Sequence, residues 1–525
     1  MIDLTQSKET VAHSRAGRIS QAITPLPPSE KETLLKQYHP DYKKEAYRKV
    51  AVGPNRGEET VHELANLLEG QSSVAVNGTT LCPDKTVDIL IVGGGGAGAA
   101  AALTAKATGA TILLATKLRL GDANTVMAEG GMQVAISEAD SPIHHYIDTL
   151  RGGHLENDPA LLKTLVTEGP SVAKWLIDMG VLFDREDNGN LSMRSGGGSS
   201  KSRLLRCKDY TGLEMMRVLK DEVLNRNIDL LEFSPVVELL THEGVCTGAI
   251  LKNLDNGHEV VISAKAVILA TGGIGRLHIQ GFPTSNHYGA TADALPIAYR
   301  AGAKLTFQDT FQYHPTGVAF PEPIAGILVT EALRSVGAQL LNAKGERFIH
   351  EMETRDVVAA AIIRECKEGR GVKTASGRLG TWLDLPLVDV INGEGTLAKR
   401  FPNMVRQFSR YNIDITKEPV LIYPTLHYQN GGVKIDTDCE STTQNLFVAG
   451  EASGGIHGRN RLMGNSLLDI VVFGRRAGAA AAKRAKESSH SALTLEHLTQ
   501  FYQEKEIAGI HTQNISPILF PNYLK

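Results

Sequence analysis

Residues 86–117 limit the fold more than any other part of the chain. An apolar run, DILIV, is followed by four glycines, an alanine-rich stretch and a second apolar run, ATILLA. This order predicts a strand, a glycine turn, a helix and a second strand, which together form one βαβ unit. Gly93, Gly95 and Gly98 form the pattern G-x-G-x-x-G directly after the first strand. Such glycines let the backbone approach a pyrophosphate at the helix N-terminus, so the sequence predicts a dinucleotide site.

The choice between FAD and NAD needs other segments. The acidic residue that often binds the ribose about 20 residues later is missing, since Thr116 and Lys117 end the second strand. Two later strands also end in glycine: AVILATGG, with Thr271 and Gly272, and LFVAGE, with Glu451. Three such segments favour an FAD fold, and the change of character between them predicts an α/β domain interrupted by an inserted domain.

Composition excludes several other classes. The net charge of −3 is too small to indicate nucleic acid or a membrane surface as a partner. The five cysteines are far apart and form no C-x-x-C pair, so we predict no iron–sulfur cluster, other metal site or disulfide framework in this chain. The N-terminal residues lack an apolar core, and the longest uncharged run is too short to span a membrane. We therefore expect a location in the cytoplasm or on the cytoplasmic face of a membrane.

Four further motifs carry a family resemblance. They are QYHPTG (312–317), TRDVV (354–358), LHYQNGG (426–432) and HGRNRLMGNSLLD (457–469). With these in order, the chain from about residue 87 to 480 resembles the succinate dehydrogenase and fumarate reductase flavoprotein superfamily, which also contains soluble fumarate reductases and L-aspartate oxidase. The resemblance implies an α/β fold: a Rossmann-like FAD-binding domain with an inserted α+β capping domain and the active site between them.

The expected domain division follows from these motifs. The regions are an N-terminal extension, the first part of the FAD-binding domain, the capping domain, the second part of the FAD-binding domain, and a short C-terminal helix and tail: 1–86, 87–307, 308–424, 425–480 and 481–525. The charged, proline-punctuated extension is read as solvated or bound to a partner, with a short helix at 61–70. Complex-forming relatives carry a long helical domain after the last motif, so the mode of partner docking stays open.

The resemblance also implies the substrate. A C4 dicarboxylate has two negative charges, and holding it calls for charge-assisted donors at both ends. By resemblance, His427 and Arg461 hold one carboxylate of fumarate or succinate, and His314 with Thr330 holds the other. A guanidinium such as that of Arg461 can grip a carboxylate through two hydrogen bonds.

The proton donor in this family is an arginine, which Arg355 matches. An isolated arginine has a pKa above about 12 and is a poor acid, so it needs a relay. Glu331 and Arg334 stand three residues apart and share one face if this segment is helical. The order Arg355, Glu331, Arg334 resembles the proton path of the family, with the hydride coming from flavin N5.

The stretch GDANTVMAEGG (121–131) bears on the cofactor linkage. In membrane-complex relatives it reads like S-H-T-V-A-A-E-G-G, and the His is bonded covalently to the flavin. Asn124 stands at that position and its amide is no nucleophile, so we expect noncovalent FAD and a bias toward fumarate reduction. By resemblance, the remaining FAD-binding residues are Thr125, Gly130, Gly131, Asp293, Asn465, Ser466 and Leu467.

Two alternatives to the fumarate reductase or succinate dehydrogenase assignment remain. In L-aspartate oxidases a Glu-Gly-Gly-His segment precedes the D-x-T-G motif, and Gly196 stands here in place of that Glu. Without the carboxylate of that Glu, the site lacks the negative charge that would bind the ammonium group of aspartate. The chain could also be an electron-transfer flavoprotein module with another substrate. Electrons must also reach the flavin. With no iron–sulfur motif in this chain, a separate iron–sulfur or heterodisulfide-reductase-like subunit is the expected partner, and the extension is a candidate docking element.

Overall fold

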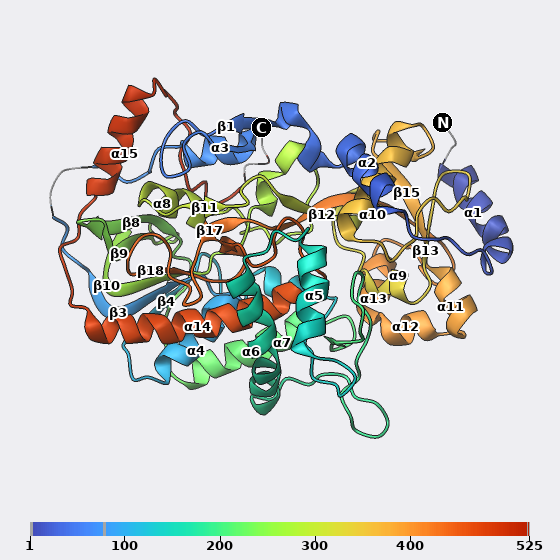
Figure 1. Cartoon of the computed structure of the whole chain (residues 1–525), viewed down its shortest axis with the longest axis horizontal. Helices are drawn as coiled ribbons and strands as arrows, with labels where there is room; N and C mark the ends of the chain where they lie inside the picture. The colour runs from blue at the N-terminus through green and yellow to red at the C-terminus, as the bar shows by residue number, and fades with distance from the viewer. Residues whose placement is uncertain (1–3, 77–79, 522, 524–525) are drawn as a thin grey trace.

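A computed structural model describes residues 4–76, 80–521 and 523 (Figure 1). Its largest sheet has the order β7-β4-β3-β10-β9-β8, with β18 paired to β10. The parallel strands are β3 (Lys85–Val92), β4 (Ile112–Ala115), β7 (Asp229–Leu231), β10 (Glu259–Leu269) and β18 (Leu446–Val448). The hairpin β8 (Val236–His242) and β9 (Val245–Lys252) extends the sheet antiparallel to β10. The predicted βαβ unit is confirmed as β3, α4 (Gly96–Lys106) and β4.

Close helix packing explains the alanines and glycines after β3. Helix α4 lies against α14 (Asn465–Glu487), the long red helix of Figure 1. A Cβ at Gly478 would lie 2.3 Å from the carbonyl oxygen of Ala101, so a side chain there would separate the helices. A Cβ at Gly98 would lie 1.8 Å from the carbonyl oxygen of Gly93, inside the turn. The residue at 98 therefore keeps the turn tight.

The inserted part of the chain forms an antiparallel sheet with the order β12-β16-β15-β13, to which β14 is paired. Its strands are β12 (Phe311–Phe320), β13 (Gln339–Leu341), β14 (Val372–Lys373), β15 (Leu379–Asp384) and β16 (Val420–Gln429). The helices of this capping region are α9 (Ala332–Ser335), α10 (Arg355–Lys367), α11 (Pro386–Asn392), α12 (Thr396–Arg400) and α13 (Pro402–Ser409). Strand β16 continues past the boundary expected at residue 424, so one strand joins the capping region to the FAD region.

The sequence of residues 142–232, with DPALLKTLVTEGPSVAKWLIDMG as its clearest amphipathic segment, predicts a mostly helical region, but this region is only partly helical. Helices α5 (Pro142–Gly152), α6 (Pro159–Asp178) and α7 (Thr211–Asn225) are present, but residues 179–210 hold only the two-residue strand β6 (Leu204–Leu205). The stretch RSGGGSSKSR has no apolar period to stabilise a helix. Instead, the buried Arg203 fixes this loop through Asp140 at 2.7 Å and Asp148 at 2.6 Å.

The remaining elements lie mostly in the FAD region and toward the chain ends, with η6 in the capping region. They are β5 (Met132–Gln133), α8 (Ala294–Arg300), β11 (Leu305–Thr306), β17 (Gly432–Lys434), β19 (Ser453–Gly454), α15 (Glu496–Ile507) and the 3₁₀ helices η1 (Pro40–Tyr42), η2 (Lys44–Ala46), η3 (Asn124–Met127), η4 (Gly275–Leu277), η5 (Ile279–Gly281), η6 (Glu322–Ile324) and η7 (Gly450–Ala452). Helix α14 crosses the boundary expected at residue 480, since it continues to Glu487.

The N-terminal extension, expected to be solvated or bound to a partner, packs on its own chain. It contains α1 (Leu4–Arg18), α2 (Pro28–Tyr38), β1 (Tyr47–Lys49), β2 (Glu59–Val61) and α3 (His62–Leu68), the last of which confirms the short helix at 61–70. In Figure 1, α1 lies beside the capping region at the right and α3 lies over the FAD region. Val11, Leu64 and Leu68 are buried in different apolar clusters of the chain. The apolar positions of the extension therefore serve packing on its own chain.

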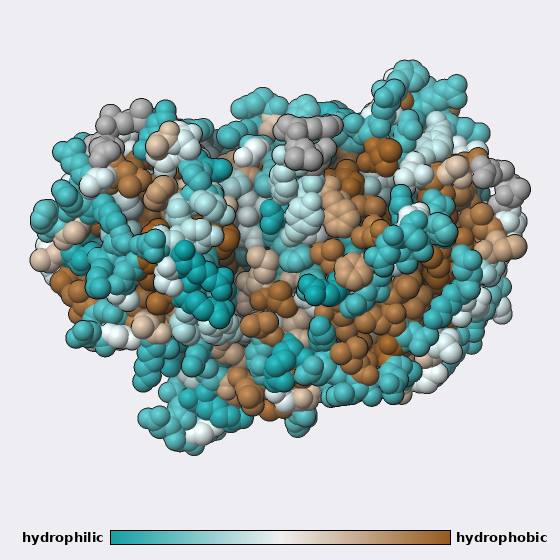
Figure 2. Space-filling view, turned by 180° about the vertical axis from the view of Figure 1, so that it is seen from behind, coloured by the Kyte–Doolittle hydropathy of each residue, from teal (hydrophilic) through white to brown (hydrophobic). Residues whose placement is uncertain are grey.

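The two halves differ on the surface as well. Seen from behind, apolar residues gather on the half that holds the seven-stranded sheet, at the right of Figure 2. Among the described residues, no helix is both long enough and apolar enough to cross a membrane.

Candidate active site

A cavity of about 500 Å³ opens where the parallel strands β3, β10 and β18 end. This volume is within the range of small-molecule sites, roughly 300–1,000 Å³. Its wall includes the three glycine turns expected from the sequence, at 93–96, 270–272 and 449–451. The carboxyl ends of parallel strands meet at one edge of a sheet, which is why turns so distant in sequence converge here.

Most of the expected cofactor residues line this cavity. They are Gly93, Gly95, Thr116, Lys117, Asn124, Thr125, Thr271, Gly272, Asp293, Glu451, Ser466 and Leu467. Gly98, Gly130, Gly131 and Asn465 are not on the wall. A Cβ at Gly131 would lie 2.6 Å from the carbonyl oxygen of Leu205, so that glycine permits a close approach of two loops. Asn465 turns away, with its amide oxygen 2.8 Å from Nε2 of His145.

The residues present fit FAD. The α4 N-terminus opens into the cavity at Gly96, whose amide donates to Thr125 Oγ1 at 3.1 Å. Gly93 has φ of +119°, and a Cβ there would lie 2.2 Å from the carbonyl oxygen of Ala270. Only glycine fits this narrow turn without blocking the cavity. The helix N-terminus beside the turn suits a pyrophosphate.

A cation replaces the missing acid at the end of β4. Lys117 Nζ lies 2.7 Å from Asp293 Oδ2 and donates at 2.7 Å to Thr291 Oγ1 and to the carbonyl oxygen of Leu519. The C-terminal segment thus returns to this end of the FAD region. No sequence signal predicted that contact, because Leu519 contributes only its backbone.

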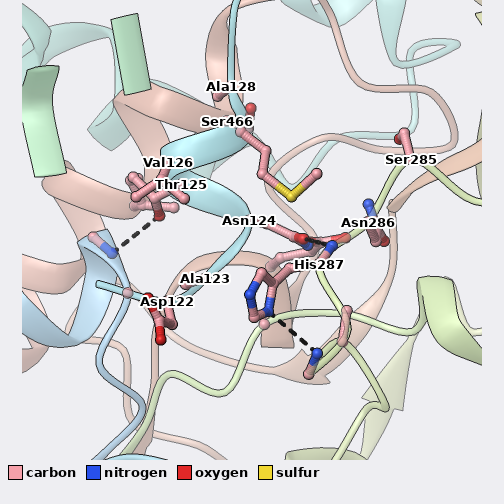
Figure 3. A pocket seen from close by; sticks show the side chains of 18 of the residues that line it. Asp122, Ala123, Asn124, Thr125, Val126, Ala128, Ser285, Asn286, His287 and Ser466 are labelled. Carbon is pink, nitrogen blue, oxygen red and sulfur yellow. Dashed lines mark hydrogen bonds between the residues drawn. The ribbon is translucent and has the colours of Figure 1, made fainter. Parts of the chain in front are cut away.

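Asn124 joins three segments of the cavity wall (Figure 3). Its Oδ1 accepts the backbone N–H of His287 at 2.6 Å, and its Nδ2 donates to Glu451 Oε2 at 3.4 Å. Glu451 Oε1 also accepts the backbone N–H of Gln429 at 3.0 Å. Burial raises the pKa of Glu451 to about 7, although these donors oppose the rise. The amide of Asn124 therefore links the 121–131 segment to the turn after β18.

Two histidines face each other where β12 and β16 leave the capping region. The ring centroids of His314 and His427 are 5.1 Å apart. His314 Nδ1 accepts the backbone N–H of Thr316 at 3.2 Å, and its Nε2 has no hydrogen-bond partner among the described residues. His427 Nδ1 lies 2.7 Å from Ser285 Oγ, and both of these residues line the FAD cavity.

The histidines are neutral. Burial, together with the charge of Arg355, holds the pKa of His314 and of His427 well below its ordinary value. A neutral His314 with an occupied Nδ1 carries its proton on the unpartnered Nε2. That N–H has no partner in the described part of the chain and lies next to His427, which lines the cavity.

Arg461 lies 3% exposed with its guanidinium 4.4 Å from the ring centroid of Tyr428. It donates to Ser466 Oγ and to Gln312 Oε1, both at 2.9 Å, while its Nε has no partner among the described residues. Burial and the charge of Arg355 lower the pKa of Arg461 to about 10, so it stays charged at neutral pH. Thr330 is buried immediately before Glu331.

The three side chains expected to form a relay lie together. Arg355 Nε donates to Glu331 Oε2 at 2.8 Å, and Arg334 lies 3.4 Å from the same oxygen. Glu331 is the N-cap of α9, so it shares one turn with Arg334. Burial alone would raise the pKa of Glu331, but the two guanidiniums hold it below its usual value. The carboxylate is therefore ionised between two cations.

Sequence reasoning missed two members of this cluster. Gln312 Oε1 accepts from Arg355 as well as from Arg461, both at 2.9 Å, and so connects the two guanidiniums. The sequence feature that could have indicated Gln312 is its place as the first residue of the motif QYHPTG. The backbone N–H of Gly197 donates to Glu331 Oε1 at 3.0 Å. A Cβ at Gly197 would lie 2.4 Å from that oxygen, so the glycine-rich loop supports the relay.

Comparisons with known proteins agree with this geometry. A family described as "FAD binding domain" matches residues 88–467. One component of the CoM/CoB fumarate reductase of Methanothermobacter marburgensis is 40% identical over 80% of this chain and 76% of its own length. An L-aspartate oxidase of Streptomyces coelicolor is 36% identical over 78% of this chain and 70% of its own length. The FrdA chain of an E. coli quinol fumarate reductase variant superposes with a TM-score of 0.73 at 31% identity, covering 80% of this chain and 74% of that one. The chain belongs to the FAD-binding oxidoreductase family that includes the flavoprotein subunits of fumarate reductase and succinate dehydrogenase.

Proposed function

We propose that the protein reduces fumarate to succinate, or catalyses the reverse reaction, with noncovalent FAD. One observation carries the proposal: the buried guanidiniums of Arg334 and Arg355 share the carboxylate of Glu331 beside the FAD cavity. Gln312 joins Arg355 to a third buried guanidinium, that of Arg461. This excess of positive charge suits a dianion, because a buried charge is stable only when it is paired.

The donors are distributed for two carboxylates. We assign one carboxylate to His427 and Arg461, which has a free Nε in the described part of the chain, and the other to Thr330 and the unpartnered Nε2 of His314. Neutral histidine N–H groups bind an anion through hydrogen bonds. The positive charge that balances the two carboxylates then comes from the guanidiniums. The substrate would thus lie against the His427 end of the cavity.

FAD supplies the hydride when it is bound. The chain's own residues would manage the proton. Arg355 donates its proton to the second carbon of fumarate and recovers it through Glu331 and Arg334. The guanidinium of Arg355 is oriented by Glu331 on Nε and by Gln312 on the other side, which limits its rotation.

L-aspartate oxidase is the second candidate, since such enzymes are among the relatives. The loop that would supply the ammonium-binding carboxylate contains Gly196 and Gly197. The carboxylate at this loop is that of Glu331, and its Oε1 accepts the N–H of Gly197. Because Glu331 is already shared by two arginines, the site favours fumarate or succinate over aspartate.

The electron route requires a further protein. In the described part of the chain, no three or more His, Cys, Asp or Glu side chains are grouped to hold a metal ion. One relative is named as a single subunit of a CoM/CoB fumarate reductase, and thus as part of a larger enzyme. We propose an iron–sulfur or heterodisulfide-reductase-like partner protein, with the assembly in the cytoplasm or on the cytoplasmic face of a membrane and a role in anaerobic respiration.

The substrate assignment predicts a preference that a simple assay measures. The FAD-loaded chain should oxidise reduced methyl viologen with fumarate and should show no oxidase activity with L-aspartate. Faster turnover of L-aspartate than of fumarate would make the protein an aspartate oxidase. If the flavin exchanges electrons only with a partner protein, the chain is an electron-transfer module without this substrate.

The relay predicts a specific loss in Arg355→Lys. General acid catalysis contributes about 10²–10⁴-fold to a rate, so kcat for fumarate should fall by about this factor while FAD binding persists. Arg364→Lys is the matched control, because Arg364 lies on the same helix and its ion pair, among the described residues, is with Glu365, away from the catalytic cluster. Near-normal turnover of Arg355→Lys would rule out the assignment of the acid.

The amide of Asn124 predicts how FAD is released. Acid precipitation of the holoprotein should leave the yellow flavin in the supernatant, measured by its absorbance and by the mass of the intact chain. Flavin that stays with the precipitated chain would show a covalent bond that Asn124 cannot form.

A further inference from the structure

The N-terminal extension lies outside residues 88–467, which match the family, and the proposed reaction does not use it. We infer that residues 4–70 form a brace that holds the capping region on the FAD region and fixes the start of α10, where Arg355 lies. The structural part of this inference stands alone, while its effect on turnover rests on the proposed function.

The first anchor is a buried carboxylate of the capping sheet. Asp384 ends β15 with a fully buried side chain. Arg15 approaches it at 2.8 Å and Arg18 at 2.8 Å, both from α1. A buried carboxylate without a cation is strongly unfavourable. Trp382 on the same strand also donates to Ser7 Oγ at 2.8 Å. The buried carboxylate of the capping sheet is therefore neutralised by cations of α1.

The second anchor lies two residues before Arg355. Glu353 has a 5% exposed side chain, and it accepts from Lys31 Nζ at 2.6 Å and from the backbone N–H of Leu26 at 2.9 Å. Beyond the other end of α10, Tyr38 donates to Glu368 at 2.5 Å. The extension thus holds α10 by the residues flanking both of its ends.

Between these two contacts, α2 packs along α10. Leu34 and Leu35 of α2 are buried in one apolar cluster with Val357 and Val358 of α10. Such packing resists sliding of one helix on the other, because protein interiors are close-packed. Residues of the extension, which lie outside the catalytic cluster, therefore fix the position of the Arg355 backbone.

The third anchor reaches the FAD region. Asp41 accepts the backbone N–H of Phe311 at 3.2 Å, and Tyr47 donates to the carbonyl oxygen of Asp309 at 3.0 Å. Farther along, Asn55 contacts Tyr299 of α8 and the backbone of Leu305 through hydrogen bonds of 3.1 and 3.0 Å. The extension therefore crosses the connection between β11 and β12, which joins the two regions.

These contacts make Lys31 a positioning residue. Arg355 reaches Glu331 and Gln312 only if α10 begins at the right place, and a displacement of about 1 Å can lower a rate about 10²-fold. Loss of the Glu353 anchor should loosen this start without removing any group that would touch substrate. It should therefore change kcat more than KM.

The test compares Lys31→Ala with Lys36→Ala. Both residues belong to α2, but the ion pair of Lys36, among the described residues, is with the exposed Glu32, so its removal is the matched control. Hydrogen exchange of the holoprotein should rise at residues 353–358 in Lys31→Ala alone. For fumarate, kcat should fall about tenfold with KM within about twofold, consistent with a sub-ångström displacement. Lys31→Arg should restore both readouts.

The outcomes separate the two proposals. Equal exchange at 353–358 in the two variants would overturn the brace, and increased exchange with unchanged kcat would overturn its positioning role. If the unaltered chain does not reduce fumarate but exchange still rises, the proposed function fails and the brace stands. Tyr38→Phe, which removes one hydroxyl, provides a milder variant and should raise exchange near residue 368.

Discussion

The rest of the active site depends on the accumulation of buried positive charge around Glu331. Arg355 is hydrogen-bonded to Glu331, and Gln312 joins Arg355 to Arg461. Arg334 forms an ion pair with the same Glu331 carboxylate, and like charges in a medium of low dielectric constant repel strongly. Gln312 and Glu331 keep the guanidiniums apart and oriented. Burial, together with the charge of Arg355, holds the pKa of both histidines well below its ordinary value. The cluster is thus arranged to bind an anion that the chain itself does not supply.

The side chains of the active site come from two separate regions of the chain. The turns after β3, β10 and β18 form the FAD cavity, while β12 and β16 bring His314 and His427 to its end. The capping region supplies Arg355 and Glu331. The proposed reaction takes place between the two regions, so they must keep their relative position. The N-terminal extension packs on both regions and holds them in place.

The sequence predicted those features that local patterns determine. The glycine turn after DILIV, the Glu331–Arg334 spacing and the four motifs led to the fold and to most of the cluster. Contacts through backbone atoms left no signal, as with Gly197 on Glu331 and Leu519 on Lys117. The prediction that 142–232 is mostly helical was wrong for residues 179–210, because Arg203 and its acidic partners stabilise an irregular loop there. The packing of the extension left no signal either, because its few apolar positions lie against segments that are distant in sequence.

A binding titration decides whether the buried cations bind a dianion beside FAD. Succinate and propionate have nearly the same carbon chain but differ by one carboxylate, and either can be followed by the change in flavin absorbance of the oxidised holoprotein. The account predicts saturable binding of succinate and at least about 100-fold weaker binding of propionate, since one charge-assisted set of hydrogen bonds is lost. Equal affinity for the two acids would contradict it.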